Sequence, residues 1–148
     1  HTLLALAGSR RGLRTVAEAM DDQELAAMTA SLWEEAARHL PPELEAGDYA
    51  DRLLQRFRNP RIEHRLSQIA QDSDDKLRLR IVPIAEAELA AGRRAQGCAF
   101  AIASWLLHDG SDDVTRGLAS LSAVLAADER FVAVVRAMLE AAPVAIRA

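Results

Sequence analysis

The sequence predicts a single all-α domain, and three observations support this fold class. Alanine leads the apolar half of the 148-residue chain, whereas aromatic residues make up only 4% and β-branched residues are scarce, a balance that favours helix over sheet. Apolar residues recur at helical spacing along most of the chain, and no stretch of useful length alternates as a strand would. The length suits one domain. We therefore expect about seven or eight helices, mostly antiparallel to their neighbours because the connections are short.

The first two helices are predicted from a short apolar segment and a capping pattern. Residues 3–7 are apolar, and glycines that follow mark a helix end and a turn. Asp21 followed by Glu24 has the pattern of a capping box, in which each side chain accepts a hydrogen bond from a free backbone N–H. The apolar stripe of this second helix consists of Leu25, Met28, Leu32, Trp33 and Ala36. Two prolines at 41–42 end it.

The next two helices are predicted from an acidic cap and an Asn-Pro pair. Asp48 can cap a helix. The apolar stripe of the helix that follows Asp48 consists of Tyr49, Leu53 and Phe57. Asn59 ends that helix and caps another, which has Pro60 at its first helical position. The inward-facing residues of this fourth helix are Ile62, Leu66 and Ile69.

The middle of the chain holds a proline-containing helix and the most apolar helix. After the acidic residues 72–75 the helical pattern resumes, with Leu77, Ile81, Ile84 and Leu89 on its apolar face. We expect Pro83 to kink this helix and Gly92 to lie at its C-terminal end. Residues 95–108 are apolar over a wide face, which places this helix near the centre of the core.

Two amphipathic helices complete the predicted fold. Gly110 ends the central helix and Ser111 caps the next one, while the last helix follows Asp128. Their apolar stripes are Val114, Leu118, Leu121 and Leu125, and then Phe131, Val135, Met138 and Leu139. Pro143 is expected to close the ordered part.

Composition narrows the class of protein. The net charge of −4 argues against a nucleic-acid partner, which requires a basic face. Cys98 is the only cysteine, so we expect no internal disulfide, and its apolar surroundings favour a small buried hydrophobe.

The longest apolar stretch, 98–107, is about half of the length that a helix needs to span a bilayer. With no signal-peptide pattern at its start, we expect a cytoplasmic protein without a membrane partner. The chain opens at His1, as though cut from a longer protein.

Metal and nucleotide sites are not predicted. Taking Asp72 as the first ligand of a calcium loop puts Lys76 at the fifth position and Pro83 where the closing Glu belongs. The acidic run is better explained as a solvated helix N-terminus. The four histidines lie far apart in the sequence, so we expect no histidine cluster. There is also no Gly-rich phosphate loop.

Lys76 is the residue that invites a functional interpretation. It is the only lysine in a chain that otherwise uses arginine. An ammonium group is a compact charge with rotatable donors, whereas guanidinium is a planar fork, so the two are not exchangeable at a shaped polar site. Lys76 is therefore a candidate binding residue. The alternative is a solvated lysine at a helix start, paired with Asp72 or Asp75.

The chain resembles the C-terminal domain of the long-chain polyol-specific dehydrogenases, which include mannitol 2-dehydrogenase and fructuronate reductase (mannonate oxidoreductase). The matching residues are His1-Thr2-Leu3-Leu4-Ala5-Leu6-Ala7-Gly8, Gly12, Val16, Glu18-Ala19-Met20, Leu53-Leu54, Arg56-Phe57, Asn59-Pro60, His64-Arg65, Gln68-Ile69-Ala70, Asp72, Lys76-Leu77, Arg80 and Pro83. The match is close over 48–92, good over 1–20 and weak beyond Gly110.

This resemblance implies a fold, a cofactor and three site residues. It implies a helical domain similar to the 6-phosphogluconate dehydrogenase C-terminal-like fold, which would make residues 1–148 the substrate-binding domain of an NAD-dependent oxidoreductase. The N-terminal Rossmann domain that binds NAD would lie outside this chain, so the chain alone should be inactive, and no metal is implied. His1 would polarise the reacting oxygen. Lys76 would contact the far hydroxyls or carboxylate of a polyol or sugar acid, and Gln68 would make a second polar contact.

Two matters stay open at this point. The family has Gly-Ser-Gln where this chain has Ser73, Asp74 and Asp75. If these carboxylates face the substrate they favour a neutral polyol over a uronate, and if they face solvent they change little. The loss of the glycine can also alter the turn. The alternative function is a non-catalytic helical module for ligand binding or dimerisation in a regulator, which would need no second domain.

Overall fold

The computed structural model describes residues 1–142. Its α-helices are α1 (Thr2–Arg10), α2 (Val16–Asp21), α3 (Gln23–Ala37), α4 (Ala46–Arg58), α5 (Leu66–Ile69), α6 (Ser73–Lys76), α7 (Val82–Ala90), α8 (Gln96–Asp109), α9 (Val114–Leu121), α10 (Ala123–Ala127) and α11 (Glu129–Ala141). A 3₁₀ turn, η1 (Pro42–Leu44), and a π-helix, η2 (Leu77–Ile81), complete the elements. The described residues contain no strand, and one isolated bridge joins Thr15 to Arg65. The all-α prediction is confirmed.

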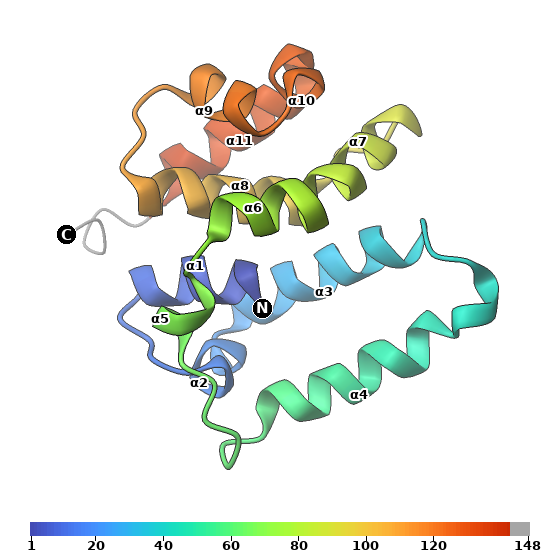
Figure 1. Ribbon diagram of the computed structural model, residues 1–148, viewed down its shortest axis with the longest axis vertical. Coiled ribbons are helices and arrows are strands. Elements are labelled where there is room, and N and C mark those ends of the chain that lie inside the picture. The colour runs from blue at the N-terminus through green and yellow to red at the C-terminus, as the bar shows by residue number, and fades with distance from the viewer. Residues whose placement is uncertain (143–148) are drawn as a thin grey trace.

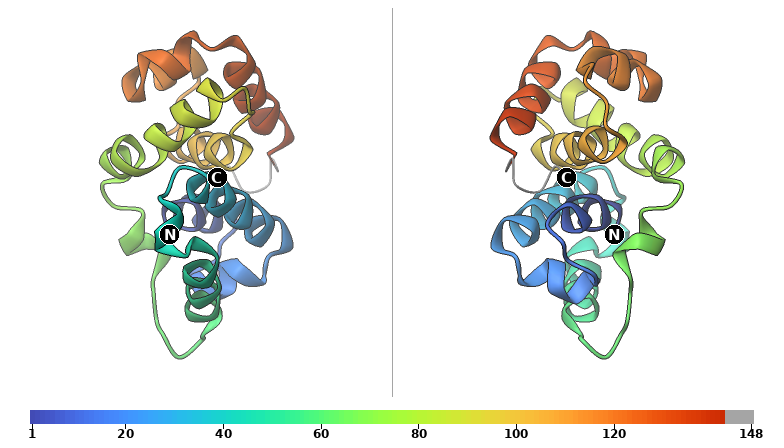
Figure 2. Two further views of the ribbon diagram at one scale, coloured as in Figure 1. Left: turned by 90° about the vertical axis from the view of Figure 1, so that its right-hand side faces the viewer. Right: turned by 90° about the vertical axis from the view of Figure 1, so that its left-hand side faces the viewer.

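The central position predicted for the most apolar helix is also confirmed. α8 packs against α1 and α3 on one side and α11 on the other, so it lies between the two halves of the chain (Figures 1 and 2). Its buried residues run almost unbroken from Gly97 to Leu106. At Gly97 the α3 backbone comes so close that a Cβ would lie 2.4 Å from the amide nitrogen of Leu32. The glycine therefore permits the contact between α3 and α8.

Two predicted caps in the N-terminal half are wrong. Asp22, not Asp21, caps α3: its backbone is extended, and its Oδ1 accepts hydrogen bonds from the amides of Glu24 and Leu25 at 3.0 and 3.2 Å. Asp21 is instead the last residue of α2. α4 begins before Asp48, which lies in its first turn.

The apolar stripe predicted for α4 holds only in part. Leu53 is partly buried and Phe57 is buried, but Tyr49 is 61% exposed. Tyr49 lies near the start of α4, at the outer end of the arm that α3 and α4 form in Figure 1. Burial is confined to the other end of the helix, where Phe57 packs near Trp33 with ring centroids 5.5 Å apart.

No helix begins at Asn59 and Pro60, contrary to the prediction. The Oδ1 of Asn59 accepts a hydrogen bond from the amide of Arg61 at 3.0 Å, which stabilises a turn. The chain then pairs with an earlier segment, where the amide of Val16 bonds to the carbonyl of His64 and the amide of Leu66 to that of Arg14. This long-range pairing takes the backbone groups that a helix would have used, so α5 begins only at Leu66.

The expected kink at Pro83 takes the form of a π-helix. η2 precedes α7, and Pro83 occupies the first turn of α7. Proline lacks a backbone N–H, and the π-helical ladder is one way for a helix to continue past it. Gly92 ends this helix as predicted, with a φ of 81°. The amide of Arg93 then bonds back to the carbonyl of Glu88 at 2.9 Å.

The C-terminal helices differ from the prediction at their starts. Asp113, not Ser111, caps α9, with its Oδ1 accepting from the amide of Arg116 at 3.0 Å. Ser122, with φ −161° and ψ 123°, interrupts the expected stripe and caps α10. α11 follows Asp128 as predicted and buries Phe131 and Val135, and Pro143 lies outside the described residues. Among the residues described, no helix is both long and apolar enough to cross a bilayer.

Candidate substrate-binding site

His1 is held by ring packing. Its carbonyl accepts the first helical hydrogen bond of α1, from Ala5 at 2.8 Å. Its imidazole is exposed, with a ring centroid 4.2 Å from that of Phe57 on α4 and 5.6 Å from that of His64. Neither ring nitrogen has a hydrogen-bond partner among the described residues, so the imidazole is oriented by its neighbours and its nitrogens are available to a ligand.

Lys76 closes the loop between α5 and α6. Its Nζ donates hydrogen bonds to the backbone carbonyls of Ile69, at 2.6 Å, and Gln71, at 2.7 Å. The sequence alternative, an ion pair with Asp72 or Asp75, is not formed within the described chain. An ammonium group has three donors. The two carbonyls therefore leave one N–H of Lys76 for another acceptor.

The residues that depart from the family pattern make their own local contacts. The Oδ1 of Asp74 accepts a hydrogen bond from the indole N–H of Trp105 on α8 at 2.8 Å, and Asp75 pairs with Arg78 at 3.2 Å. Ser73 donates its hydroxyl to the carbonyl of Ala70. The left-handed residue of this turn is Asp72, with a φ of 55°, whereas Ser73 is helical. The position of the lost glycine therefore does not need a positive φ.

Two further residues join the candidate site that sequence reasoning did not place there. The positive charges of Arg80 and Lys76 act on the backbone nitrogen of His1. Both cations therefore lie near the start of α1. His64 is the other addition, and the expectation that no histidines cluster is wrong for His1 and His64. Arg80 was already among the residues that match the family pattern, and its spacing of four residues from Lys76 was a second signal in the sequence.

Gln68 lies on the short helix α5. α5 packs against α1, and the chain continues from it into α6 (Figure 1). The residue is exposed. Its neighbour Ile69 supplies one of the carbonyls that bind Lys76. The backbone thus joins Gln68 to Lys76, while the glutamine side chain makes no hydrogen bond to the described residues.

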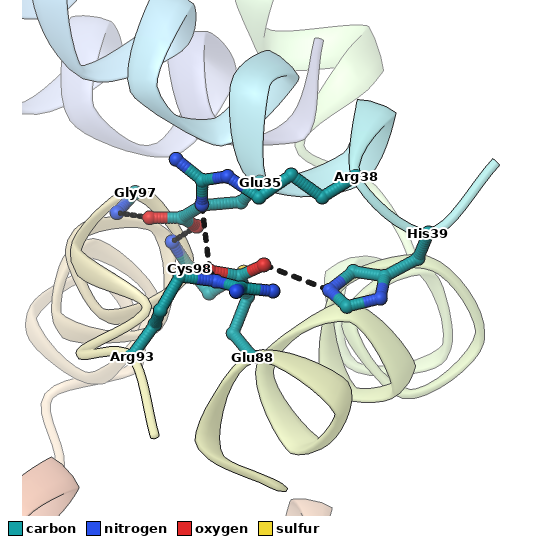
Figure 3. Close-up of polar contacts among 7 residues, drawn as sticks. All are labelled: Glu35, Arg38, His39, Glu88, Arg93, Gly97 and Cys98. Atoms are coloured by element: carbon teal, nitrogen blue, oxygen red, sulfur yellow. Dashed lines mark hydrogen bonds and ion pairs between the residues drawn. The ribbon is translucent and has the colours of Figure 1, made fainter. Parts of the chain in front are cut away.

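A buried polar cluster fixes the helices on which this site depends (Figure 3). Glu88 on α7 is fully buried, and its carboxylate bonds to Arg38 at 2.7 Å, His39 at 2.7 Å and Arg93 at 2.8 Å. Burial raises the pKa of Glu88, but hydrogen bonds from Arg93 and His39 and the charges of both arginines outweigh it, so the pKa lies below its ordinary value. The cluster ties the end of α3 to α7.

Glu35 makes the matching connection between α3 and α8. Its buried carboxylate accepts hydrogen bonds from the amides of Gly97, at 2.7 Å, and Cys98, at 3.0 Å, and so satisfies free N–H groups in the first turn of α8. Burial, and then the nearby charge of Glu35, raises the pKa of the Cys98 thiol. Cys98 therefore stays protonated, and its burial confirms that it is a small core residue.

The described residues show neither a metal site nor a dinucleotide cradle. Within residues 1–142 no three His, Cys, Asp or Glu side chains are grouped to hold a metal ion. The same residues include no strand leading into a glycine-rich turn and helix, which is what a dinucleotide cradle requires. A cavity of about 160 Å³ between α1, α3, α8 and α11 does not include His1, Gln68 or Lys76. Of the three candidate residues, His1 and Gln68 are exposed and Lys76 is half-buried.

Comparison with known proteins agrees with the resemblance inferred from sequence. The family described as "Mannitol dehydrogenase C-terminal domain" matches residues 1–141. Altronate oxidoreductases of Escherichia coli O139:H28 and O9:H4 are each 39% identical over 99 residues, which is 66% of this chain and 20% of the relative. The chain therefore spans about a fifth of the length of the curated relatives it matches.

Proposed function

Because the chain belongs to the mannitol dehydrogenase C-terminal domain family, we propose that it forms the substrate-binding part of an NAD-dependent oxidoreductase. The reaction would interconvert a sugar alcohol or an aldonate with its keto form. The observation that supports this proposal is that Lys76 and Arg80 lie near His1, at the start of α1. Charged and neutral donors in one region are what the recognition of a polyhydroxylated compound requires.

The three predicted residues take distinct roles in this proposal. The imidazole of His1 donates a hydrogen bond to the oxygen that alternates between hydroxyl and carbonyl, and so stabilises the charge that develops there. The remaining N–H of Lys76 binds the far end of the substrate, which orients the carbon that reacts. Gln68 offers an amide beside Lys76 for a second hydroxyl.

The dinucleotide belongs to a partner domain in this proposal. The described residues do not fit it, for the reasons given above, so the nucleotide would be bound by the N-terminal Rossmann domain of the same protein. Bound there, NAD supplies the hydride acceptor. The exposed face that carries His1 and Lys76 then forms one wall of a cleft between the two domains.

Kinetics of the full gene product that contains this chain test the proposal. With NAD and a panel of D-mannitol, D-mannonate and D-altronate, Lys76→Ala should raise KM strongly, and His1→Ala should mainly lower kcat. Arg130→Ala, at an exposed position on α11, is the matched control and should change neither constant. The chain alone should show no turnover.

Two outcomes would contradict the proposal. An unchanged KM in Lys76→Ala would remove that residue from the site. Absence of turnover by the full product on every such substrate would favour the non-catalytic alternative.

A further inference from the structure

We propose that Phe57 and His64 are positioning residues, whose rings pack against the imidazole of His1 and set the direction in which its nitrogens meet the substrate. This inference rests on the proposed function, in which His1 hydrogen-bonds the reacting oxygen. It adds two residues to that site, and neither was among the predicted site residues.

The imidazole of His1 depends on ring packing for its orientation. The residue is exposed and its ring forms no hydrogen bond within residues 1–142, so polar contacts do not choose its rotamer. Its centroid lies 4.2 Å from that of Phe57, with the planes tilted by 34°, and 5.6 Å from that of His64, with a tilt of 51°. Tilted ring pairs of this kind attract one another. The two rings therefore restrict the rotation of the imidazole.

Phe57 is a rigid support for this contact. It lies in the last turn of α4 and is 3% exposed. Its ring also packs against Trp33 on α3, with centroids 5.5 Å apart, so two helices hold it. Side chains in a close-packed interior stay in one arrangement on average. The surface that Phe57 presents to His1 is accordingly fixed.

His64 is held by its backbone. Its amide donates a hydrogen bond to the carbonyl of Ile62 at 3.0 Å, and its carbonyl accepts one from the amide of Val16 at 3.0 Å. The residue is half-buried, and its ring nitrogens bond to none of the described residues. The ring of His64 is thus placed from a fixed backbone, and its contact with the described chain is the one with His1.

The direction of the imidazole decides how well it can serve the proposed reaction. A donor stabilises the developing charge only when its N–H points at the oxygen, and a misplacement of about 1 Å can cost roughly 100-fold in rate. In the proposed site Phe57 and His64 act on His1 and not on the substrate. Loss of either ring should therefore lower kcat and leave KM almost unchanged.

Substitutions of His64 in the full gene product, assayed with NAD and D-mannitol, D-mannonate and D-altronate, test this role. His64→Ala and His64→Asn should each lower kcat by roughly 3- to 10-fold, the size of one lost ring contact. KM should stay within about twofold. His64→Phe keeps a ring but no nitrogen and should restore kcat to within about twofold of the wild type. Phe57→Leu should lower kcat similarly, but it also removes core packing, so the His64 variants carry the test.

A double-mutant cycle separates positioning from a general loss of stability. In a His1→Ala background, His64→Ala should have no further effect on kcat, because no imidazole is left to orient. His108→Ala is the matched control: His108 is an exposed histidine on α8 whose ring packs against no other ring of the described chain. This variant should change neither constant.

Three results would overturn the inference. Additive losses in the double variant would mean that His64 does not act through His1. If His64→Asn kept the wild-type kcat while His64→Phe lost it, His64 would act through its nitrogens. A wild-type kcat in His64→Ala would remove its role while the proposed function stands. Absence of turnover by the full product on every such substrate would instead refute the proposed function, and this inference with it.

Discussion

Replacing Glu88 tests whether the buried cluster in Figure 3 holds the fold together. The Glu88 side chain is 1% exposed and bonds to Arg38, Arg93 and His39, of which the two arginines are 43% and 41% exposed. Breaking a buried ion pair from one side costs about 3–5 kcal/mol. Because solvent can still reach both guanidinium groups, we expect the lower end of this range, about 3 kcal/mol, for Glu88→Gln.

Chemical and thermal unfolding of the chain, followed by circular dichroism, measure this loss. For a domain of this size the melting temperature should fall by roughly 6–12 °C. Glu34→Gln, an exposed residue on α3, is the matched control and should stay within about 0.5 kcal/mol of the wild type. A Glu88→Gln variant as stable as that control would refute the idea that the cluster joins α3 to α7.

The pH dependence provides a second measurement on the same cluster. The pKa of Glu88 is lowered in the folded state from its ordinary value of 4.5. Its contribution to the free energy of unfolding is therefore fully present above pH 4.5 and is lost as the pH falls through the folded-state pKa. The wild type should accordingly lose more stability on acidification than Glu88→Gln does. Parallel acid unfolding curves would contradict the lowered pKa.

Three further predictions follow from the packing and the caps. Gly97→Ala should destabilise the fold by about 1–3 kcal/mol in urea unfolding, since the added Cβ would meet the backbone of Leu32; wild-type stability would mean that α3 and α8 are not in close contact. Asp113→Ala should cost about 1 kcal/mol as a lost cap, whereas Ser111→Ala should cost less, and the reverse order would restore Ser111 as the cap of α9. Cys98 should resist a thiol reagent at pH 8 until the chain unfolds, because burial raises its pKa; rapid labelling of the folded chain would contradict that burial.

The parts of the fold that the sequence predicts are those decided by local pattern. The wide apolar face of residues 95–108 predicted a central helix. A face this wide is buried only when other helices pack on several sides of it, and α8 has that position. At α3 the pattern located the start within one residue, since Asp21 and Asp22 are both good caps. Asp22 is the one that caps α3, and Arg11 holds it there by bonding to both Asp22 and Glu24 across the turn.

Errors concentrate where distant residues decide the structure. Asn59 and Pro60 have the local chemistry of a helix start, but the pairing of Arg14 and Val16 with Leu66 and His64 overrides it. The same pairing includes the backbone of His64, whose ring lies beside that of His1. A spacing of 63 residues carries no hint of that contact, so the histidine pair could not be predicted from the sequence.

In the candidate site, too, local features were predictable from the sequence and long-range contacts were not. The uniqueness of Lys76 and the order of the family residues were readable in the sequence, and they single out His1, Gln68 and Lys76 as predicted site residues that the kinetics would test. The orientation of Asp74 was not readable, because it depends on Trp105, 31 residues further along. That contact turns the Asp74 carboxylate toward α8, which the local sequence gives no means to predict.

Lys76 has a structural contact in addition to its predicted binding role. Its ammonium group bonds to the carbonyls of Ile69 and Gln71, a compact arrangement that a planar guanidinium fork would not reproduce in the same turn. Those bonds hold the α5–α6 loop around the charge and leave one N–H of the ammonium group unused by them. A lysine in a chain of arginines is accounted for by this geometry, in which one small cation closes a loop and still has a spare donor.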